Sequence, residues 1–311
     1  MKKIIFGVDL GGTQIKLGKF DFDGLIDKYA IDTNISDEGS HIIPDIASFI
    51  TGNLNEDEEL VGLSIGVPGP VACCVVLGAQ NINWLEVDVE KEFHKFFPNI
   101  IVGVLNDANA ALLGECYFGS GKGYKDLVML TLGTGLGGGI LIGGEVYEGA
   151  TGSSGEVGHI CLERNGRSCT CGLKGCLEQY VSATGIVRTA KEVLLNSKEE
   201  SILRDKDLTS KLIFDSAKVG DKLAIEVTER VTDDLACGIA SICNTINPEI
   251  VILGGGVSAA GSFLLKKVEE KFVNYAFYSL RFSTKFALAV LENDAGIYGN
   301  YQNILGKVKW K

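Results

Sequence analysis

Two similar apolar runs, each interrupted by a glycine turn, stand out in the pattern of hydrophobic and polar residues. Residues 4–9 are apolar and rich in β-branched side chains, and after a glycine turn the apolar pattern resumes at residues 15–20. Residues 128–132 and 140–142 repeat this arrangement around the glycine-rich segment 133–139. Each unit predicts a strand, a tight turn and a second strand. Because the two units are similar, we expect two lobes of like design with a cleft between them.

The rest of the chain alternates between short apolar runs and segments with helical periodicity. This alternation, in a chain of 311 residues, predicts an α/β fold with one large or two ordinary domains. A hairpin turn is expected at 21–24. The strands are expected at 60–67, 99–105, 249–253 and 286–291, and the helices at 40–52, from 106, 178–195, 210–218, 222–246, 261–277 and from about 295.

Charge and hydropathy exclude several classes of protein. The net charge of −11 argues against a nucleic-acid surface, which would be basic. No apolar run approaches the roughly 18 residues that span a bilayer, so we expect no membrane partner. The apolar run at the N-terminus is too short for a secretory signal, and we therefore expect a cytoplasmic location.

Four residues with metal-ligating side chains lie close together in the sequence. His159, Cys169, Cys171 and Cys176 offer one imidazole and three thiols, a closed tetrahedral set suited to structural zinc. The alternative is a group of buried free cysteines. The other six cysteines are expected to be small buried residues. Cys116, Cys161, Cys237 and Cys243 lie in apolar contexts, and the neighbours Cys73 and Cys74 stand where polar turn residues would be usual.

Two carboxylates bracket the cysteine cluster in the sequence. Glu156 precedes His159 by three residues, and Glu178 follows Cys176 by two. A metal that holds the loop would also bring Glu156, His159 and Glu178 to one place. We therefore expect the metal to act as a clamp on a binding site.

The glycine turns are candidates for phosphate binding. Asp9 ends a predicted strand and precedes Gly11, Gly12 and Thr13, so that backbone amides can approach a phosphate while the carboxylate holds Mg²⁺ through water. The 133–135 turn, Gly-Thr-Gly, repeats this device. Neither turn is a Walker loop or a dinucleotide fingerprint, because no Gly-Lys-Ser/Thr follows and a strand rather than a helix comes next. A third glycine corner, at 254–256, would let an adenine ring lie against the backbone.

Asn106 and Asp107 follow a predicted buried strand, at the strand end where α/β proteins place their sites. One interpretation of Asp107 is a helix cap or a first-turn acid. The other is a catalytic carboxylate, since phosphoryl transfer to a hydroxyl needs one group that accepts the hydroxyl proton. Asp107 fits that need, while Asp9, Thr13 and Thr134 fit the binding of phosphate and Mg²⁺.

These motifs, in this order and over essentially the whole chain, resemble the ROK family of sugar kinases and sugar-responsive repressors. The quoted segments are Asp-Leu-Gly-Gly-Thr, Leu-Asn-Asp-Ala-Asn-Ala-Ala, Leu-Gly-Thr-Gly-Leu-Gly-Gly-Gly, Glu-x-Gly-His, Cys-x-Cys-Gly-x-x-Gly-Cys-x-Glu and Asn-Pro-Glu-Ile-Val-Ile-Leu-Gly-Gly-Gly. The resemblance implies an actin-like/hexokinase-like (ribonuclease H-like) fold, a small lobe of residues 1–106 plus 296–311, and a large lobe of residues 107–295. It also implies ATP, Mg²⁺, structural zinc and usually a homodimer.

The resemblance further implies a role for each matching residue. Asp107 would be the base that takes the proton of the sugar's 6-hydroxyl. The other implied sugar contacts are Gly66, Asn81, Asn106, Glu156, His159 and Glu178. The implied phosphate and Mg²⁺ contacts are Asp9, Gly11, Gly12, Thr13, Lys16, Thr134 and Gly135, and Gly254, Gly255 and Gly256 would bind adenosine. In one departure from the family, Gln80 stands where a proline more often precedes Asn81, which bears on the rigidity of that loop.

The leading prediction is an ATP-dependent hexokinase acting on glucose. N-acetylmannosamine, N-acetylglucosamine and fructose remain alternative substrates, and polyphosphate or ADP alternative donors. From another class, a sugar-sensing repressor would need a DNA-reading helix-turn-helix ahead of the first strand, whereas this sequence reaches that strand at residue 3 or 4. An actin-like filament protein or chaperone would have no use for Glu156, His159 and Glu178 beside a zinc loop.

Overall fold

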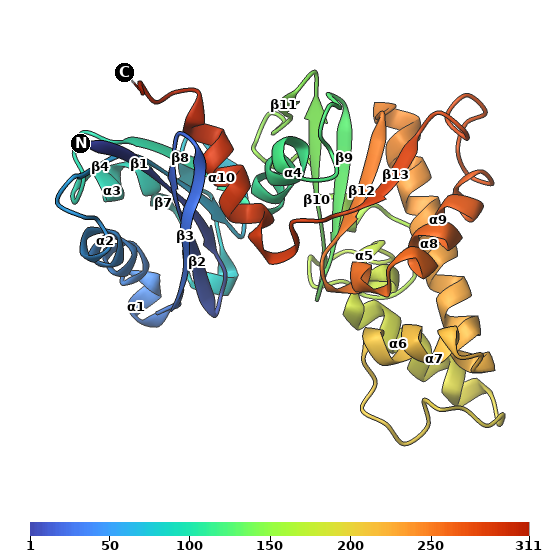
Figure 1. Cartoon of the computed structure of the whole chain (residues 1–311). Helices are drawn as coiled ribbons and strands as arrows, with labels where there is room; N and C mark the ends of the chain where they lie inside the picture. The colour runs from blue at the N-terminus through green and yellow to red at the C-terminus, as the bar shows by residue number, and fades with distance from the viewer. Residues whose placement is uncertain (311) are drawn as a thin grey trace. The chain divides into compact units, whose positions relative to one another are not determined.

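The computed structural model describes residues 1–310, which form two compact units (Figure 1). Unit 1 comprises residues 1–123, 146–154 and the chain from 291 onward, and unit 2 comprises 124–145 and 155–290. This division differs from the predicted lobes, which separate residue 106 from residue 107. The helix that begins at Asp107 instead packs closely against the last helix of the chain and belongs to unit 1.

Unit 1 is built on a five-stranded sheet in which an antiparallel meander continues into parallel strands. The strand order is β3 (Gly24–Asp32), β2 (Gln14–Asp21), β1 (Lys2–Leu10), β4 (Glu58–Val67) and β8 (Ile101–Asn106). The first three strands are antiparallel, whereas β1, β4 and β8 run parallel. The parallel strands therefore end together at one edge of the sheet.

Side chains along β1 point alternately to the two faces of this sheet, and different helices cover each face. Alternate apolar residues of β1, such as Phe6 and Val8, pack in a core with α2 (Ile42–Gly52) and α3 (Val89–His94). Ile5 points the other way, into a second core with α10 (Ala295–Leu305). Since both faces are covered, the central strand β1 is buried on both sides, as is typical of parallel strands.

Two helices of unit 1 approach each other unusually closely. These are α4 (Asp107–Phe118) and α10, and glycines at their crossing remove the side chains that would separate them. A Cβ at Gly299 would overlap the Ala110 carbonyl oxygen, and one at Gly114 would overlap that of Ala295. Buried Asn300 also ties α10 to the sheet, since its Nδ2 donates to the Val8 oxygen at 2.7 Å. The start of α4 is thereby held against the strand ends.

Unit 2 repeats the strand arrangement of unit 1. Its sheet has the order β11 (Glu145–Val146), β10 (Leu136–Ile142), β9 (Leu127–Leu132), β12 (Ile250–Gly254) and β13 (Lys285–Leu288). The pair β9/β10 is antiparallel, as is β1/β2, and two parallel strands follow in both sheets. The internal echo predicted from the sequence is therefore confirmed.

The helices of unit 2 pack on this sheet through a large apolar core. They are α5 (Glu178–Val181), α6 (Ala183–Asn196), α7 (Ser210–Lys218), α8 (Lys222–Ile246) and α9 (Ser262–Phe272). The single helix predicted over 178–195 is wrong in one respect, because it is interrupted at Ser182. Ser182 has an extended backbone, and its Oγ accepts from the Gly185 N–H at 3.2 Å, so it caps α6.

A small three-stranded sheet, missed by the sequence analysis, lies in unit 1. Its strands, β5 (Val71–Ala72), β6 (Val75–Val76) and β7 (Val87–Asp88), have two residues each, which is too short for periodicity to reveal. Cys73 and Cys74 form the turn between β5 and β6, with φ of 49° and 64°. Their position is thus explained by a tight hairpin turn with two left-handed residues.

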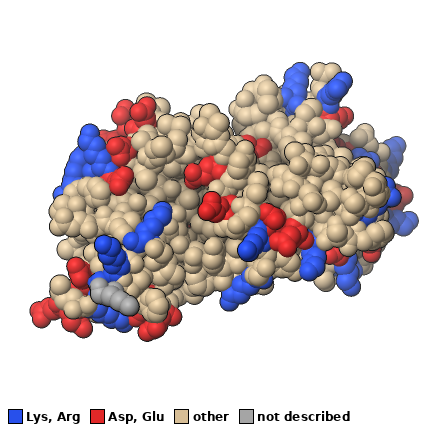
Figure 2. Space-filling model, turned by 90° about the horizontal axis from the view of Figure 1, so that it is seen from above, with Lys and Arg blue, Asp and Glu red and all other residues tan. Residues whose placement is uncertain are grey.

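Charged side chains of both signs lie on the face of the molecule shown in Figure 2. On the face drawn in Figure 2, lysine and arginine side chains of the described residues are scattered among acidic ones and form no continuous basic area. Among residues 1–310, the helices fall short of the combined length and apolar character that crossing a bilayer requires.

Candidate active site

The parallel strands of unit 1 bring four of the predicted site residues to one sheet edge. The register pairs Asp9 of β1 with Gly66 of β4, and Val67 with Asn106 of β8. Asp107 follows as the first residue of α4. Residues far apart in the sequence therefore meet at the carboxyl ends of β1, β4 and β8, where α/β folds place their ligands.

Asn106 caps α4, and Asp107 is an acid of its first turn. The Asn106 Oδ1 accepts from the N–H groups of Ala108 at 3.0 Å and Asn109 at 3.3 Å, and its Nδ2 donates to the Gly69 oxygen at 3.1 Å. Asp107 is exposed, and its Oδ1 accepts from the Ala108 N–H at 2.8 Å. The positive end of the helix favours an ionised carboxylate at this position. Asp107 is therefore the first-turn acid of α4, and its carboxylate is exposed at the edge of the sheet.

Gly66 allows α4 to begin directly over β4. A Cβ at this position would lie 2.9 Å from the Asn300 Nδ2 and 3.1 Å from the Ala110 Cβ. The neighbours would have to move to accommodate any side chain. Gly66 is therefore needed for packing beside Asp107, whatever ligand it contacts.

The first glycine turn is rigid and lies beside Asn81. Gly11 donates its N–H to the Gln14 oxygen at 3.0 Å and accepts from the Thr33 Oγ1 at 2.7 Å. A Cβ at Gly12 would come within 3.2 Å of the Asn81 oxygen in the short helix η1 (Gln80–Ile82). The turn is thus fixed from two sides, and it brings Asn81 next to the predicted phosphate contacts.

Burial disfavours the charged form of the Asp9 carboxylate. Burial raises the pKa of Asp9, and Lys16, whose Nζ lies 3.5 Å from the Asp9 Oδ2, only partly offsets this effect. The start of α10 also lies against Asp9, since a Cβ at Gly296 would be 2.8 Å from the Asp9 Cγ. A bound divalent cation would favour the ionised form, and carboxylates are preferred ligands of hydrated Mg²⁺.

In unit 2 the glycine turn between β9 and β10 packs against Glu178. The Leu136 N–H donates to the Glu178 Oε2 at 3.0 Å, and a Cβ at Gly135 would lie 2.6 Å from the same oxygen. The Thr134 oxygen accepts from the Thr184 Oγ1 at 3.0 Å, and Thr134 itself is exposed. The turn therefore presents the residue between its two glycines to solvent.

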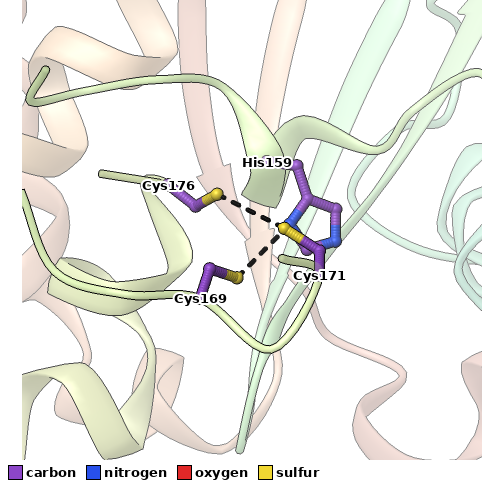
Figure 3. A group of neighbouring side chains, drawn as sticks. All are labelled: His159, Cys169, Cys171 and Cys176. Carbon is purple, nitrogen blue, oxygen red and sulfur yellow. Dashed lines mark hydrogen bonds between the residues drawn. The ribbon is translucent and has the colours of Figure 1, made fainter. Parts of the chain in front are cut away.

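The four predicted metal ligands converge in unit 2 (Figure 3). Their donor atoms all lie within 4.8 Å of one another, with 3.8 Å between the Cys169 Sγ and the His159 Nδ1, and 3.7 Å between the sulfurs of Cys171 and Cys176. Tetrahedral zinc with ordinary bond lengths would place two sulfurs ~3.8 Å apart and a sulfur and a nitrogen ~3.6 Å apart. The donor set fits zinc in both spacing and chemistry.

Protonation of the thiols depends on their surroundings in this cluster. Burial and hydrogen bonds to Cys171 and Cys169 raise the pKa of Cys176 to about 12. Burial also acts to raise the pKa of Cys169, but hydrogen bonds with Cys171, Cys176 and His159 outweigh it and lower the value to about 7. A metal ion would have to displace the remaining protons, so metal affinity must rise with pH.

The predicted clamp residues surround this cluster. His159 turns Nδ1 toward the cysteines and Nε2 toward Glu156, whose Oε2 lies 3.8 Å away. On the other side, the Glu178 Oε1 lies 3.9 Å from the Cys169 Sγ. Glu178 therefore connects the metal loop with the glycine turn at Gly135.

The third glycine corner is partly explained by packing. A Cβ at Gly254 would lie 2.8 Å from the Met129 Cε, and one at Gly255, where φ is 81°, would lie 2.6 Å from the Leu132 oxygen. Gly256 faces open space. Packing requires the first two glycines, whereas the third leaves the backbone accessible.

A cavity that no sequence motif predicts lies beside Thr134. The cavity has a volume of about 580 Å³, and its polar lining includes Thr184, Arg188 and Lys191. These side chains come from one helical segment that carries no motif. The two cations give this part of the cavity lining a positive charge.

Arg167, which was also missed, anchors the metal loop. Its guanidinium is mostly buried, donates to the Gln179 oxygen at 2.7 Å and to the Glu192 Oε2 at 2.5 Å, and lies over the Tyr180 ring. It therefore connects the loop to α5 and α6. Its charge within a loop of predicted ligands was the only available signal in the sequence.

Comparison with known proteins identifies the family. The ROK family pattern matches residues 5–305. The chain belongs to the ROK family. It is 38% identical over 305 residues to a glucokinase of Halalkalibacterium halodurans, covering 94% of this chain and 92% of that protein. It is 36% identical over 303 residues to a glucokinase of Thermotoga maritima, covering 95% of each chain.

A solved structure of the same family also matches the fold. The ROK family glucokinase from Streptomyces griseus, solved in complex with glucose and AMPPNP, superimposes with a TM-score of 0.78 at 32% identity. The match covers 96% of this chain and 98% of that chain. The predictions of a ROK protein and of a hexokinase-like, actin-like α/β fold are therefore confirmed.

Proposed function

We propose that this ROK protein is a hexose kinase that transfers the γ-phosphoryl group of ATP to the 6-hydroxyl of glucose. The observation that carries the proposal is the meeting of Asp9, Gly66, Asn106 and Asp107 at one end of the parallel strands of unit 1. This edge combines an exposed carboxylate, suited to accepting a proton, with a second carboxylate suited to Mg²⁺. Glucokinases related to this chain along nearly its full length support the choice of glucose.

In the proposed mechanism, Asp107 accepts the proton of the 6-hydroxyl as that oxygen attacks the phosphorus. The start of α4 holds the carboxylate in place, because the Ala108 N–H donates to the Asp107 Oδ1. When bound, Mg²⁺ neutralises the charge of the transferring phosphoryl group. Asp9 would hold the ion, while Lys16 and the amides of Gly12 and Thr13 would bind phosphate oxygens. Gly11, whose N–H donates to the Gln14 oxygen, would hold the turn in shape beside them.

Unit 2 supplies the other proposed contacts. Glu156, His159 and Glu178 would bind sugar hydroxyls by charge-assisted hydrogen bonds. With the His159 Nδ1 directed to a zinc ion, the ring would offer Nε2–H to a hydroxyl. His159, Cys169, Cys171 and Cys176 would hold that zinc, which would be structural because all four positions are filled.

The nucleotide is also expected to contact unit 2. Thr134 and Gly135 would face its phosphates, with Arg188 and Lys191 nearby in the 580 Å³ cavity. The backbone at Gly254, Gly255 and Gly256 would contact the adenosine.

We also expect the protein to be a cytoplasmic homodimer whose product, glucose 6-phosphate, enters glycolysis. Small sugars and ATP are the expected partners, with neither nucleic acid nor membrane. The alternative substrates are N-acetylmannosamine, N-acetylglucosamine and fructose, and the alternative role is sugar-sensing regulation; the test below separates these. Polyphosphate and ADP are the alternative donors.

The test is ADP release from Mg-ATP with a panel of sugars, which comprises glucose, mannose, fructose, N-acetylglucosamine and N-acetylmannosamine. Asp107→Asn serves as the blank. Turnover that depends on glucose and disappears in the blank would support the proposal. A larger kcat/KM for another sugar would replace glucose, whereas sugar binding without turnover would favour a regulator.

A further inference from the structure

Cys161 is an exposed thiol beside the metal cluster that the proposed function does not use. The sequence analysis expected a small buried residue at this position, and that expectation is wrong because Cys161 is exposed. The metal donors are the four other residues, so this thiol lies outside the donor set. Cys161 nevertheless forms an antiparallel bridge with one of the ligands, Cys176.

The hydrogen bonds around this bridge define how the two cysteines face each other. Leu162 donates its N–H to the Gly175 oxygen at 2.8 Å, and Leu177 donates to the Ile160 oxygen at 2.9 Å. These bonds flank the cysteine pair instead of joining it. Cys161 and Cys176 therefore form a non-hydrogen-bonded antiparallel pair, in which Cα atoms lie about 4.5 Å apart and the side chains share one face.

This separation is suited to a disulfide. Bridged cysteines have Cα atoms about 4.4–6.8 Å apart, and the pair falls within that range without movement of the backbone. The two thiols differ in access, because Cys176 is 1% exposed while Cys161 is open to solvent. A dissolved oxidant would therefore reach Cys161 first.

We propose that Cys161 is an oxidation site that forms a disulfide with Cys176 and so removes one of the four metal donors. With hydrogen peroxide, the Cys161 sulfur attacks one peroxide oxygen, the O–O bond breaks, and a sulfenic acid and water result. The Cys176 sulfur, a thiolate while it holds the metal, would then attack the Cys161 sulfur. The S–O bond breaks, and the oxygen leaves as a second water by taking up a proton from solvent. The two sulfurs lose two electrons in total, and the peroxide gains them.

The disulfide would change the metal loop at a sensitive point. His159, Cys169 and Cys171 would remain as donors, which is one fewer than tetrahedral zinc requires. Glu178, a proposed sugar contact, lies two residues after Cys176. Loss of sugar binding on oxidation is therefore expected, and this part of the inference rests on the proposed function.

The experiment compares the full-length wild type with two variants before and after treatment with hydrogen peroxide. Cys161→Ser removes the proposed site, and Cys73→Ser, which removes an exposed cysteine of unit 1, is the matched control. Released zinc is measured with a chromogenic chelator. Disulfides are located by mass spectrometry of peptides after the free thiols have been alkylated. The same mapping is repeated on chelator-treated protein, so that a disulfide is read out with and without metal.

The expected result is a linked Cys161–Cys176 peptide pair in the wild type and in Cys73→Ser, with zinc release that dithiothreitol and added zinc reverse. Cys161→Ser should keep its zinc at the same peroxide dose. Equal zinc loss from Cys161→Ser, or Cys171–Cys176 as the main disulfide, would overturn the proposal. Neither readout depends on turnover, so failure of the kinase assay and failure of this inference are distinguishable.

Discussion

Replacing Asn106 with Ala should lower the free energy of unfolding of unit 1 by about 2 kcal/mol. The Asn106 Oδ1 caps two amides of α4, and loss of such a cap costs about 1 kcal/mol. Its Nδ2 also donates to the Gly69 oxygen, and a hydrogen bond of this kind contributes about 1 kcal/mol. Asn106→Asp is the matched control, because it keeps the capping oxygen and loses only the donor. It should therefore lose about 1 kcal/mol.

The two tryptophans of the chain make this prediction measurable. Trp84 and Trp310 both belong to unit 1, so urea unfolding followed by tryptophan fluorescence reports that unit. The midpoint should fall in the order wild type, Asn106→Asp, Asn106→Ala, with an unchanged slope. An Ala variant as stable as the wild type would show that water replaces both bonds. An Asp variant as unstable as the Ala variant would refute the capping role.

Four other changes test the site. Asp107→Asn should reduce turnover about 10²–10⁴-fold while calorimetry still detects sugar binding, and near-normal turnover would remove Asp107 from the base role. Cys171→Ser should lose zinc, measured by elemental analysis, and bind sugar more weakly; fully active wild type without metal would contradict the clamp. Thr134→Val should raise the KM for ATP more than that for sugar, and the opposite order would count against phosphate contact. Asp9→Asn should abolish activity yet be more stable than the wild type at neutral pH. Because the pKa of Asp9 is raised above its ordinary value of 3.8, the folded wild type binds the proton more tightly, and its stability relative to the variant should fall as pH increases above that value. Equal stability of the two proteins across pH 4–7 would refute this sign.

The sequence predicted those parts of the fold in which local pattern and tertiary packing agree. The continuous apolar run along β1 reflects a strand buried on both sides, so its position and its turn could be inferred directly. The break at Ser182 could not, because the residues on either side of it keep a helical pattern. The extended backbone of Ser182, whose hydroxyl accepts from the Gly185 N–H, separates α5 from α6. At this break the Ala183 N–H donates to the Gly133 oxygen, a tertiary contact. The two-residue strands β5–β7 are likewise fixed by tertiary contacts, since they have no period of their own.

Some residues of the candidate site could likewise be predicted from the sequence, and others could not. The metal ligands could be predicted because their chemistry is concentrated within 18 residues, and the structure brings all four together. Arg167 and the cavity beside Thr134 could not, because their roles depend on which helices pack next to the loop. Exposure of Cys161 was also beyond reach, since an apolar neighbourhood in the sequence does not determine which side of a bridge faces solvent.

Glu178 lies where it would couple the binding of the two substrates. One of its oxygens accepts from the Leu136 N–H at the glycine turn, and the other lies 3.9 Å from the Cys169 Sγ of the metal loop. If sugar hydroxyls bind this carboxylate and phosphates bind the turn, each ligand orders a group that the other also needs. Binding free energies coupled in this way are reciprocal, so the factor by which glucose tightens nucleotide binding must equal the factor by which nucleotide tightens glucose binding. One carboxylate would then couple the two binding sites through a single coupling free energy.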